Sequence, residues 1–282
     1  MKYKIILILL LTCSAFAFPQ NKSEKSFVEA KYKCVYSVKY INDIAKMTYG
    51  TEDHFILLIG EDLAYGDSFL RSNMVSLSSN PKTDKDWFKS FVESFKDGTI
   101  VNYYSSLLMF ACIYKDYKEN KIKVIDKISG NFFLYEEENE PQSWILHDDT
   151  ITIAGYLCQK ALCQWRGRDY EAWFTPEIPI NEGPWKFHGL PGLIIKLHDT
   201  QLHYEFDLLE FKETNEKINI NPLITKTFKY FGTHKLQNTD RITFLRTQFG
   251  GRGDVIRAAD QAKLGITYVP SGWTYSYIEL DY

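Results

Sequence analysis

The sequence of 282 residues lacks an excess of basic residues, internal repeats and, beyond its first 17 residues, any long apolar run. Its formal net charge is −3, whereas nucleic-acid-binding proteins are usually basic, so we expect no nucleic-acid partner. A membrane-spanning helix needs about 20 apolar residues. The best later candidate, Leu107–Tyr114, is far shorter and predicts a buried strand. An apolar content of 45% indicates a globular chain, which we predict to be a single domain over residues 18–282.

Catalytic motifs are also missing. There is no Gly-x-Ser-x-Gly elbow, no P-loop and no His-Glu-x-x-His pair. Tyr65–Phe69 resembles the nucleophile block of GDSL-type esterases, but the Asp-x-x-His block that would activate its serine is absent. His147-Asp148-Asp149 and His198-Asp199 are better explained as aspartate-containing turns than as metal sites. We therefore expect no catalytic residue, metal or cofactor, and favour a protein that is not an enzyme.

The N-terminus has the pattern of a secretory signal peptide over residues 1–17. Lys2 and Lys4 precede the apolar run Ile5–Leu11, and small residues at Ala15 and Ala17 favour cleavage after Ala17. The alternative is a lipoprotein signal in which Cys13 carries the lipid, although Thr12 fits that pattern poorly. Either pattern predicts export to the cell envelope, as a periplasmic, outer-membrane-associated or secreted protein.

Four cysteines follow the predicted cleavage site, and in an oxidising envelope this even number favours two disulfides. Cys158 and Cys163 on one extended strand would lie about 16 Å apart, too far for a bond. Two connectivities remain, which join Cys34 and Cys112 to that strand in either order. Four free buried thiols are the alternative, and a zinc site is disfavoured because no Cys-x-x-Cys pair exists.

The chain is mostly β in pattern. Residues 28–40 alternate between apolar and polar for a dozen positions, which predicts a long antiparallel strand with one wet face. The fold class that we predict is α+β and rich in β, with a large, mostly antiparallel, curved sheet and a few covering helices. Further strands are expected at 54–59, 110–117, 122–128, 132–136, 143–147, 151–165, 169–175, 193–198, 203–211 and 273–282, and helices within 83–95 and 239–263.

The most unusual segment is Thr175–Ile194, here called the Pro/Gly loop, which holds four of the nine prolines. Because exposed loops are normally polar, an apolar one must pack against something. One interpretation is a rim around an apolar ligand, with Arg168, Lys186 and Glu177 as its polar groups; the other is a plug that completes the core. The ligand-lining candidates are Trp185, Phe187, Leu190, Pro191 and Leu193.

The loop ends in Gly189-Leu190-Pro191-Gly192-Leu193-Ile194, and this motif resembles the signature of the GLPGLI family. Gly155–Ala161, Gly167–Thr175 and Glu177–Phe187 are similar to the same family. The resemblance implies an exported envelope protein of Bacteroidetes without an established activity. Within it, Gly189, Gly192, Tyr156 and Trp173 would be structural motif residues.

The order of elements is similar to that of the half-barrel envelope carriers of the LolA type, which is a likeness of fold only. The aromatic content of 16%, the apolar Pro/Gly loop and the missing catalytic motifs instead favour a binding or carrier protein for an apolar or peptide-like ligand. Two alternatives stay open. One is an accessory subunit with an outer-membrane protein partner, and the other is a hydrolase whose active site joins His188 to an acidic residue distant in sequence.

Overall fold

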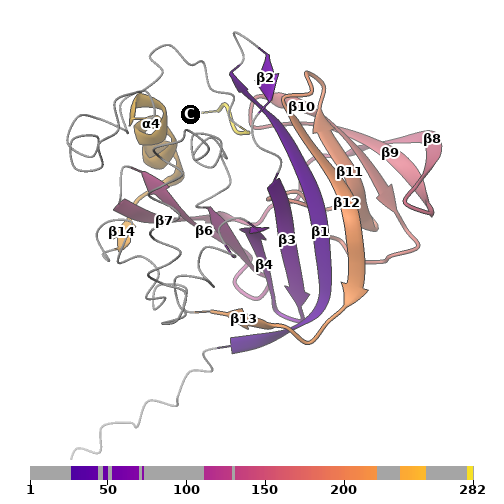
Figure 1. The fold of residues 1–282 in the computed structure, drawn as a ribbon, viewed down its shortest axis with the longest axis horizontal. Helices are drawn as coiled ribbons and strands as arrows, with labels where there is room; N and C mark the ends of the chain where they lie inside the picture. Colours follow the sequence, from indigo (N-terminus) through magenta and orange to yellow (C-terminus); the bar gives the residue numbers. More distant parts are fainter. Residues whose placement is uncertain are drawn as a thin grey trace, which may run out of the picture.

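Figure 1 shows a computed structural model of the chain. It describes residues 27–43, 47–49, 53–69, 72, 111–128, 131–220, 236–251 and 278–281. The expected signal peptide (1–17) and the expected helix within 83–95 lie outside these ranges.

One large sheet dominates the described residues, with one α-helix, α4 (Arg241–Gly251), near one end of it. The strands are β1 (Phe27–Asp43), β2 (Thr48–Tyr49), β3 (Asp53–Gly60), β4 (Leu63–Ser68), β5 (Cys112–Asp116), β6 (Lys121–Ile128), β7 (Asn131–Glu138), β8 (Ile145–Ile153), β9 (Tyr156–Trp165), β10 (Arg168–Thr175), β11 (Leu193–Asp199), β12 (Tyr204–Glu213), β13 (Lys217–Asn219) and β14 (Leu236–Asn238).

The strand order is β14-β7-β6-β5-β4-β3-β1-β12-β11-β10-β9-β8, with β2 and β13 also paired to β1. Every pairing is antiparallel except that of β14 with β7. The sheet is strongly curved (Figure 1), which confirms the predicted fold class of a β-rich chain with a large, mostly antiparallel sheet. Among the described residues, no helix has the length and apolar character needed to cross a membrane.

Strand β1 is the centre of the fold because it joins the two halves of the sheet. It pairs with β12 on one side and with β3 on the other. Its Cys34, Tyr36, Val38 and Tyr40 are buried, whereas Lys31 and Lys39 are exposed, as the alternating pattern predicts. Register shifts near Ala30 and between Val35 and Tyr36 interrupt the pairing, and such bulges bend a strand.

Two boundaries differ from prediction. The strand expected over 151–165 is interrupted, because Ala154 and Gly155 adopt positive φ angles of 51° and 86° and form a two-residue hairpin turn between β8 and β9. The aspartates at 148 and 149 therefore belong to strand β8 rather than to a turn. The described part of the expected C-terminal strand, 278–281, is not a strand.

The cysteines also differ from the expectation of two disulfides, because these four described cysteines form no disulfide bond and all four are buried. Cys34 faces the main hydrophobic core, and Cys112 belongs to a second cluster that also contains Leu58 and Tyr114. Cys158 and Cys163 lie on β9, four strand positions from β1 in the sheet. Neighbouring strands are about 4.8 Å apart, so the sheet itself separates these partners.

Candidate functional site

The Pro/Gly loop runs from the end of β10 to the start of β11, and most of its residues are buried. Four of its ligand-lining candidates belong to the main hydrophobic core, with exposed fractions of 6% or less: Trp185, Phe187, Leu190 and Leu193. Pro191 is exposed. The loop therefore occupies the position of a plug, the second of the two interpretations of its apolar sequence.

Phe187 is the centre of this packing. Its ring centroid lies 4.7 Å from that of Trp165, 4.6 Å from that of Tyr170 and 6.3 Å from that of Trp144. Such tilted aromatic pairs add about 1 kcal/mol each beyond their buried area. Of the other motif residues, Tyr156 and Trp173 both pack against the same core. The Trp173 ring also contacts Lys160, whose Nζ lies 5.8 Å from the ring centroid.

Two glycines of the motif allow the loop to close. A Cβ atom on Gly192 would lie 2.1 Å from the main-chain oxygen of Thr175, so the close approach of the two backbones requires glycine. Gly189 has a φ of 99°, a conformation that side chains rarely tolerate, and a Cβ atom there would lie 2.5 Å from the Cβ of Pro141.

Beneath the loop lies a group of three cations and three carboxylates, here called the Lys186 cluster. Lys186 is 1% exposed, and its Nζ lies 2.6 Å from both Glu137 Oε1 and Glu279 Oε1. Arg166 Nη2 lies 2.8 Å from Glu137 Oε2. Arg241 Nε lies 2.6 Å from Glu279 Oε2, and its Nη2 contacts Asp281. Each carboxylate therefore faces at least two cations.

The cluster joins five separate parts of the chain: β7, the β9–β10 turn, the Pro/Gly loop, the start of α4 and the segment 278–281. Burial alone would raise the pKa of the Glu279 carboxyl, but the charges of Lys186, Arg241 and Arg166 outweigh it and hold that pKa at about 2. Burial likewise opposes the charge of Lys186, yet the adjacent anions raise its pKa. Glu279 and Lys186 therefore both remain ionised at neutral pH.

A second buried ion pair supports the same loop from the sheet. Lys115 Nζ lies 2.6 Å from Glu182 Oε2 and donates to the main-chain oxygen of Phe187 at 3.2 Å. Tyr117 donates to the other oxygen of Glu182 at 2.7 Å. Strand β5 thus holds the loop at Glu182 and at Phe187.

His188, the residue of the hydrolase alternative, lies close to this pair. Its side chain is buried, and its Nε2 has no hydrogen-bond partner. Burial and the charge of Lys115 lower its pKa to about 3. The charge that acts on this imidazole is therefore a cation, whereas a general base is normally supported by a carboxylate.

Arg168, another expected rim residue, is buried in a contact of its own. Its Nη1 donates to Asp199 Oδ2 at 2.8 Å and lies 3.1 Å from His203 Nδ1. Asp199 also accepts the Tyr204 main-chain N–H at 2.7 Å. Glu177 is exposed, so the structure does not bring Arg168, Lys186 and Glu177 together as one rim.

The serine of the esterase-like block is also engaged. Ser68 is 1% exposed and donates to Asp53 Oδ2 at 2.6 Å. The described residues contain no group of three or more histidines, cysteines, aspartates or glutamates arranged to hold a metal ion.

A groove of about 1050 Å³ lies at the N-terminal end of β1. Much of its lining is charged, with lysines and carboxylates from β1, β12, β13 and the turns that follow β3 and β5. These groups are Glu29, Lys31, Glu61, Asp62, Lys118, Glu213 and Lys217. This chemistry does not suit an apolar ligand.

A comparison with protein-family models matches the part of the chain that contains the motif. Residues 167–196, which include Lys186 and the Gly189–Ile194 motif, match a family model described as "Protein of unknown function (Porph_ging)". No curated protein sequence matches the chain. Two solved structures, described as "Structure of PNGF-II in P21 space group" and "Structure of PNGF-II in C2 space group", align with 79% of this chain at 13% and 14% identity, each with a TM-score of 0.48. The chain spans about a third of their length (34% and 33%).

The close backbone contact at Gly192 leads to a prediction about the stability of the protein. Gly192→Val should lower the free energy of unfolding by about 3 kcal/mol or more, because the new Cβ overlaps the Thr175 carbonyl. Gly155→Ala is the matched control, since no atom lies within 4 Å of its added Cβ and its cost is about 1 kcal/mol from the backbone alone. Urea unfolding measures both; an unchanged midpoint for Gly192→Val would show that this contact is not a constraint.

The burial of His188 leads to a prediction about how the free energy of unfolding depends on pH. In the folded protein the His188 imidazole takes up a proton only near pH 3, whereas in the unfolded chain it does so near pH 6.5. The free energy of unfolding therefore falls as the pH drops through this window. Between pH 7 and pH 5 we expect this residue to account for a loss of about 2 kcal/mol.

Urea unfolding of the wild type and of His188→Gln at both pH values tests this, and the variant should lose correspondingly less stability. The interval excludes Glu279, whose stabilising contribution is lost only below about pH 4.5, where the unfolded carboxyl takes up its proton. An equal loss in both proteins would contradict the prediction.

Proposed function

We propose that the protein is an exported envelope protein of the GLPGLI type that binds a peptide-like ligand without catalysing a reaction. The resemblance of the motif, and the match of residues 167–196 to a family model, support the family. The contacts of the candidate catalytic groups support a binding role. Ser68 is held by Asp53, and His188 is neutral and adjacent to Lys115.

The observation that favours a peptide over an apolar small molecule is the edge strand β8. It ends the sheet and pairs only with β9 among the described strands. Figure 1 shows the β8–β9 hairpin at the far end of the sheet from α4. The main-chain groups along one side of such a strand are free to pair with an added strand.

The side chains of this edge are apolar and exposed, with Ile145 at 64%, Leu146 at 50%, Ile151 at 48% and Leu157 on β9 at 56%. Leu157 pairs with Thr152 and shares its face, whereas Ile151 lies on the other face. An added strand would therefore cover apolar groups on both faces of the edge.

The register of β8 limits where such a strand would pair. Pairing with β9 is regular from Thr150 to Ile153 but breaks between Leu146 and Thr150. Asp148 and Asp149 occupy this break and are exposed. The ligand that fits is an extended segment with apolar residues opposite Thr150–Ile153 and a basic residue opposite the two aspartates.

Native mass spectrometry of the protein purified from its own envelope tests this proposal. A peptide at near-equal stoichiometry is expected on the wild type, and Ile151→Lys should reduce its occupancy about 10-fold, because the added cation disrupts the apolar contact and repels a basic ligand. The matched control is Leu209→Lys on β12. Leu209 is exposed to 58%, compared with 48% for Ile151, but lies away from this edge, so this variant should bind normally.

Other outcomes separate the alternatives. A co-purifying lipid would favour a carrier of apolar ligands, and recovery of an outer-membrane protein would favour an accessory subunit. A protein without bound ligand, or a peptide whose occupancy Ile151→Lys does not change, would overturn the assignment to β8.

A further inference from the structure

The segment Ile278–Asp281 lies on the fold in the manner of a bound peptide. Its main chain makes two hydrogen bonds, from Leu280 N to Arg166 O at 2.8 Å and from Tyr170 OH to Ile278 O at 2.8 Å. Leu280 covers Gly167 so closely that a Cβ atom there would lie 2.9 Å from the Leu280 Cβ. Neither Ile278 nor Leu280 belongs to a strand of the sheet.

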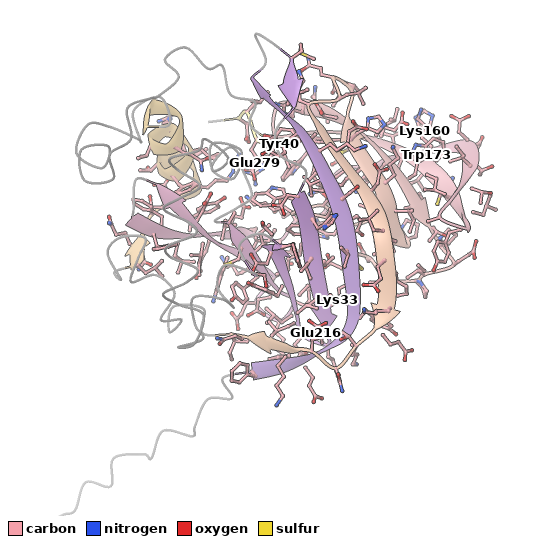
Figure 2. The ribbon with its side chains drawn as sticks, in the orientation of Figure 1. Lys33, Tyr40, Lys160, Trp173, Glu216 and Glu279 are labelled. Atoms are coloured by element: carbon pink, nitrogen blue, oxygen red, sulfur yellow. The ribbon has the colours of Figure 1, made fainter. Side chains whose placement is uncertain are left out.

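Glu279 is the side chain by which this segment is held. Its carboxylate oxygens lie 2.6 Å from Lys186 Nζ, 2.6 Å from Arg241 Nε and 3.4 Å from Arg166 Nη1. The indole of Trp185 donates to it at 3.3 Å. Only 2% of the carboxylate side chain is exposed, and Figure 2 shows it between α4 and β1, on the opposite side of the view from Lys160 and Trp173.

The charges around Glu279 come from elements other than its own segment. Arg166 lies in the β9–β10 turn, Lys186 in the Pro/Gly loop and Arg241 at the start of α4. Among the described residues, these three cations would share the single carboxylate of Glu137 if residues 278–281 were removed. A buried excess of positive charge is strongly unfavourable, so the pocket requires a carboxylate from elsewhere.

We propose that Arg166, Trp185, Lys186 and Arg241 form a peptide-binding site for a glutamate flanked by apolar residues, which Ile278–Asp281 fills within one chain and which accepts the same segment from a second molecule. The glutamate gives the site its charge specificity. The two main-chain hydrogen bonds and the contact of Leu280 with Gly167 fix the direction and register of the segment. This site is separate from the β8 edge and does not depend on a ligand there.

The test uses the chain shortened after residue 277 and a fluorescein-labelled peptide with the sequence of residues 275–282. Fluorescence anisotropy should show saturable binding, and replacing the residue that corresponds to Glu279 by Gln should weaken it at least about 10-fold. Replacing Asp281 by Asn should weaken it less, because that side chain is 43% exposed. Equal binding of the Glu and Gln peptides, or no saturable binding, would overturn the proposal.

Variants of the shortened chain locate the site. Arg166→Gln should weaken binding, and Lys196→Gln is its control, because Lys196 forms an ion pair with Asp207 on the sheet at 2.9 Å. In the full-length protein, Glu279→Gln should bind the wild-type peptide more tightly than the unaltered chain does, because its own segment is held less firmly. Equal effects of the Arg166 and Lys196 substitutions would count against the site.

The shortened chain could fail to fold, and circular dichroism then provides the readout. Recovery of the native spectrum with the Glu peptide but not with the Gln peptide would support the site. Recovery with neither peptide, or equally with both, would overturn it.

Discussion

The neutralisation of Lys186 inside the protein is the interaction on which the other features of the site depend. Removing an ammonium group from water costs several kcal/mol, and here Glu137 and Glu279 offset that cost, each at 2.6 Å. These partners come from β7 and from residues 278–281, and Arg166 and Arg241 neutralise them in turn. A buried ion pair of this kind often adds little net stability, but it fixes which segments must meet. The cluster thereby selects one arrangement of five distant parts of the chain.

The conformation of the Pro/Gly loop places Lys186 in this arrangement. Phe187 enters the aromatic group of Trp144, Trp165 and Tyr170, which brings the preceding Lys186 to its carboxylates. Gly192 then lets the chain pass against Thr175 at a distance that no side chain would allow. The residues that carry the family resemblance therefore have a structural explanation. They close the loop over a charged interior and leave its apolar side chains in the core.

The strands could be predicted from the sequence because a half-buried strand leaves a pattern of period two, and β1 shows that pattern over most of its length. The division between β8 and β9 could not be predicted in this way. Ala154 is not a residue that usually signals a turn, and the apolar pattern on both sides of Gly155 predicts one continuous strand. The ligand-lining candidates lie in one loop between β10 and β11, and apolar composition alone does not distinguish a rim from a core.

The Lys186 cluster shows the limit of sequence reasoning more clearly. Lys186 could be singled out because a lysine stands among buried aromatic residues of the motif. Its partners Glu137 and Glu279 lie in unremarkable charged sequence, and only the fold brings them within 2.6 Å of it. The disulfide expectation failed for a related reason. The even number of cysteines carries no information about distance, and the sheet places β9, with Cys158 and Cys163, four strand positions from Cys34 on β1 and further still from Cys112 on β5.

The central position of β1 has a consequence for the time course of folding. Among the described strands it is the first to be synthesised, yet its neighbour β12 follows much later, as the hydrogen bond between Ser37 and Asp207, 170 residues apart, illustrates. Contacts of such high sequence separation slow folding, because a long loop must close before any pairing is gained. The pairing of β1 with β12, which joins the two halves of the sheet, therefore cannot begin until residues 204–213 have been synthesised, whereas β1 can pair with β3 soon after it emerges.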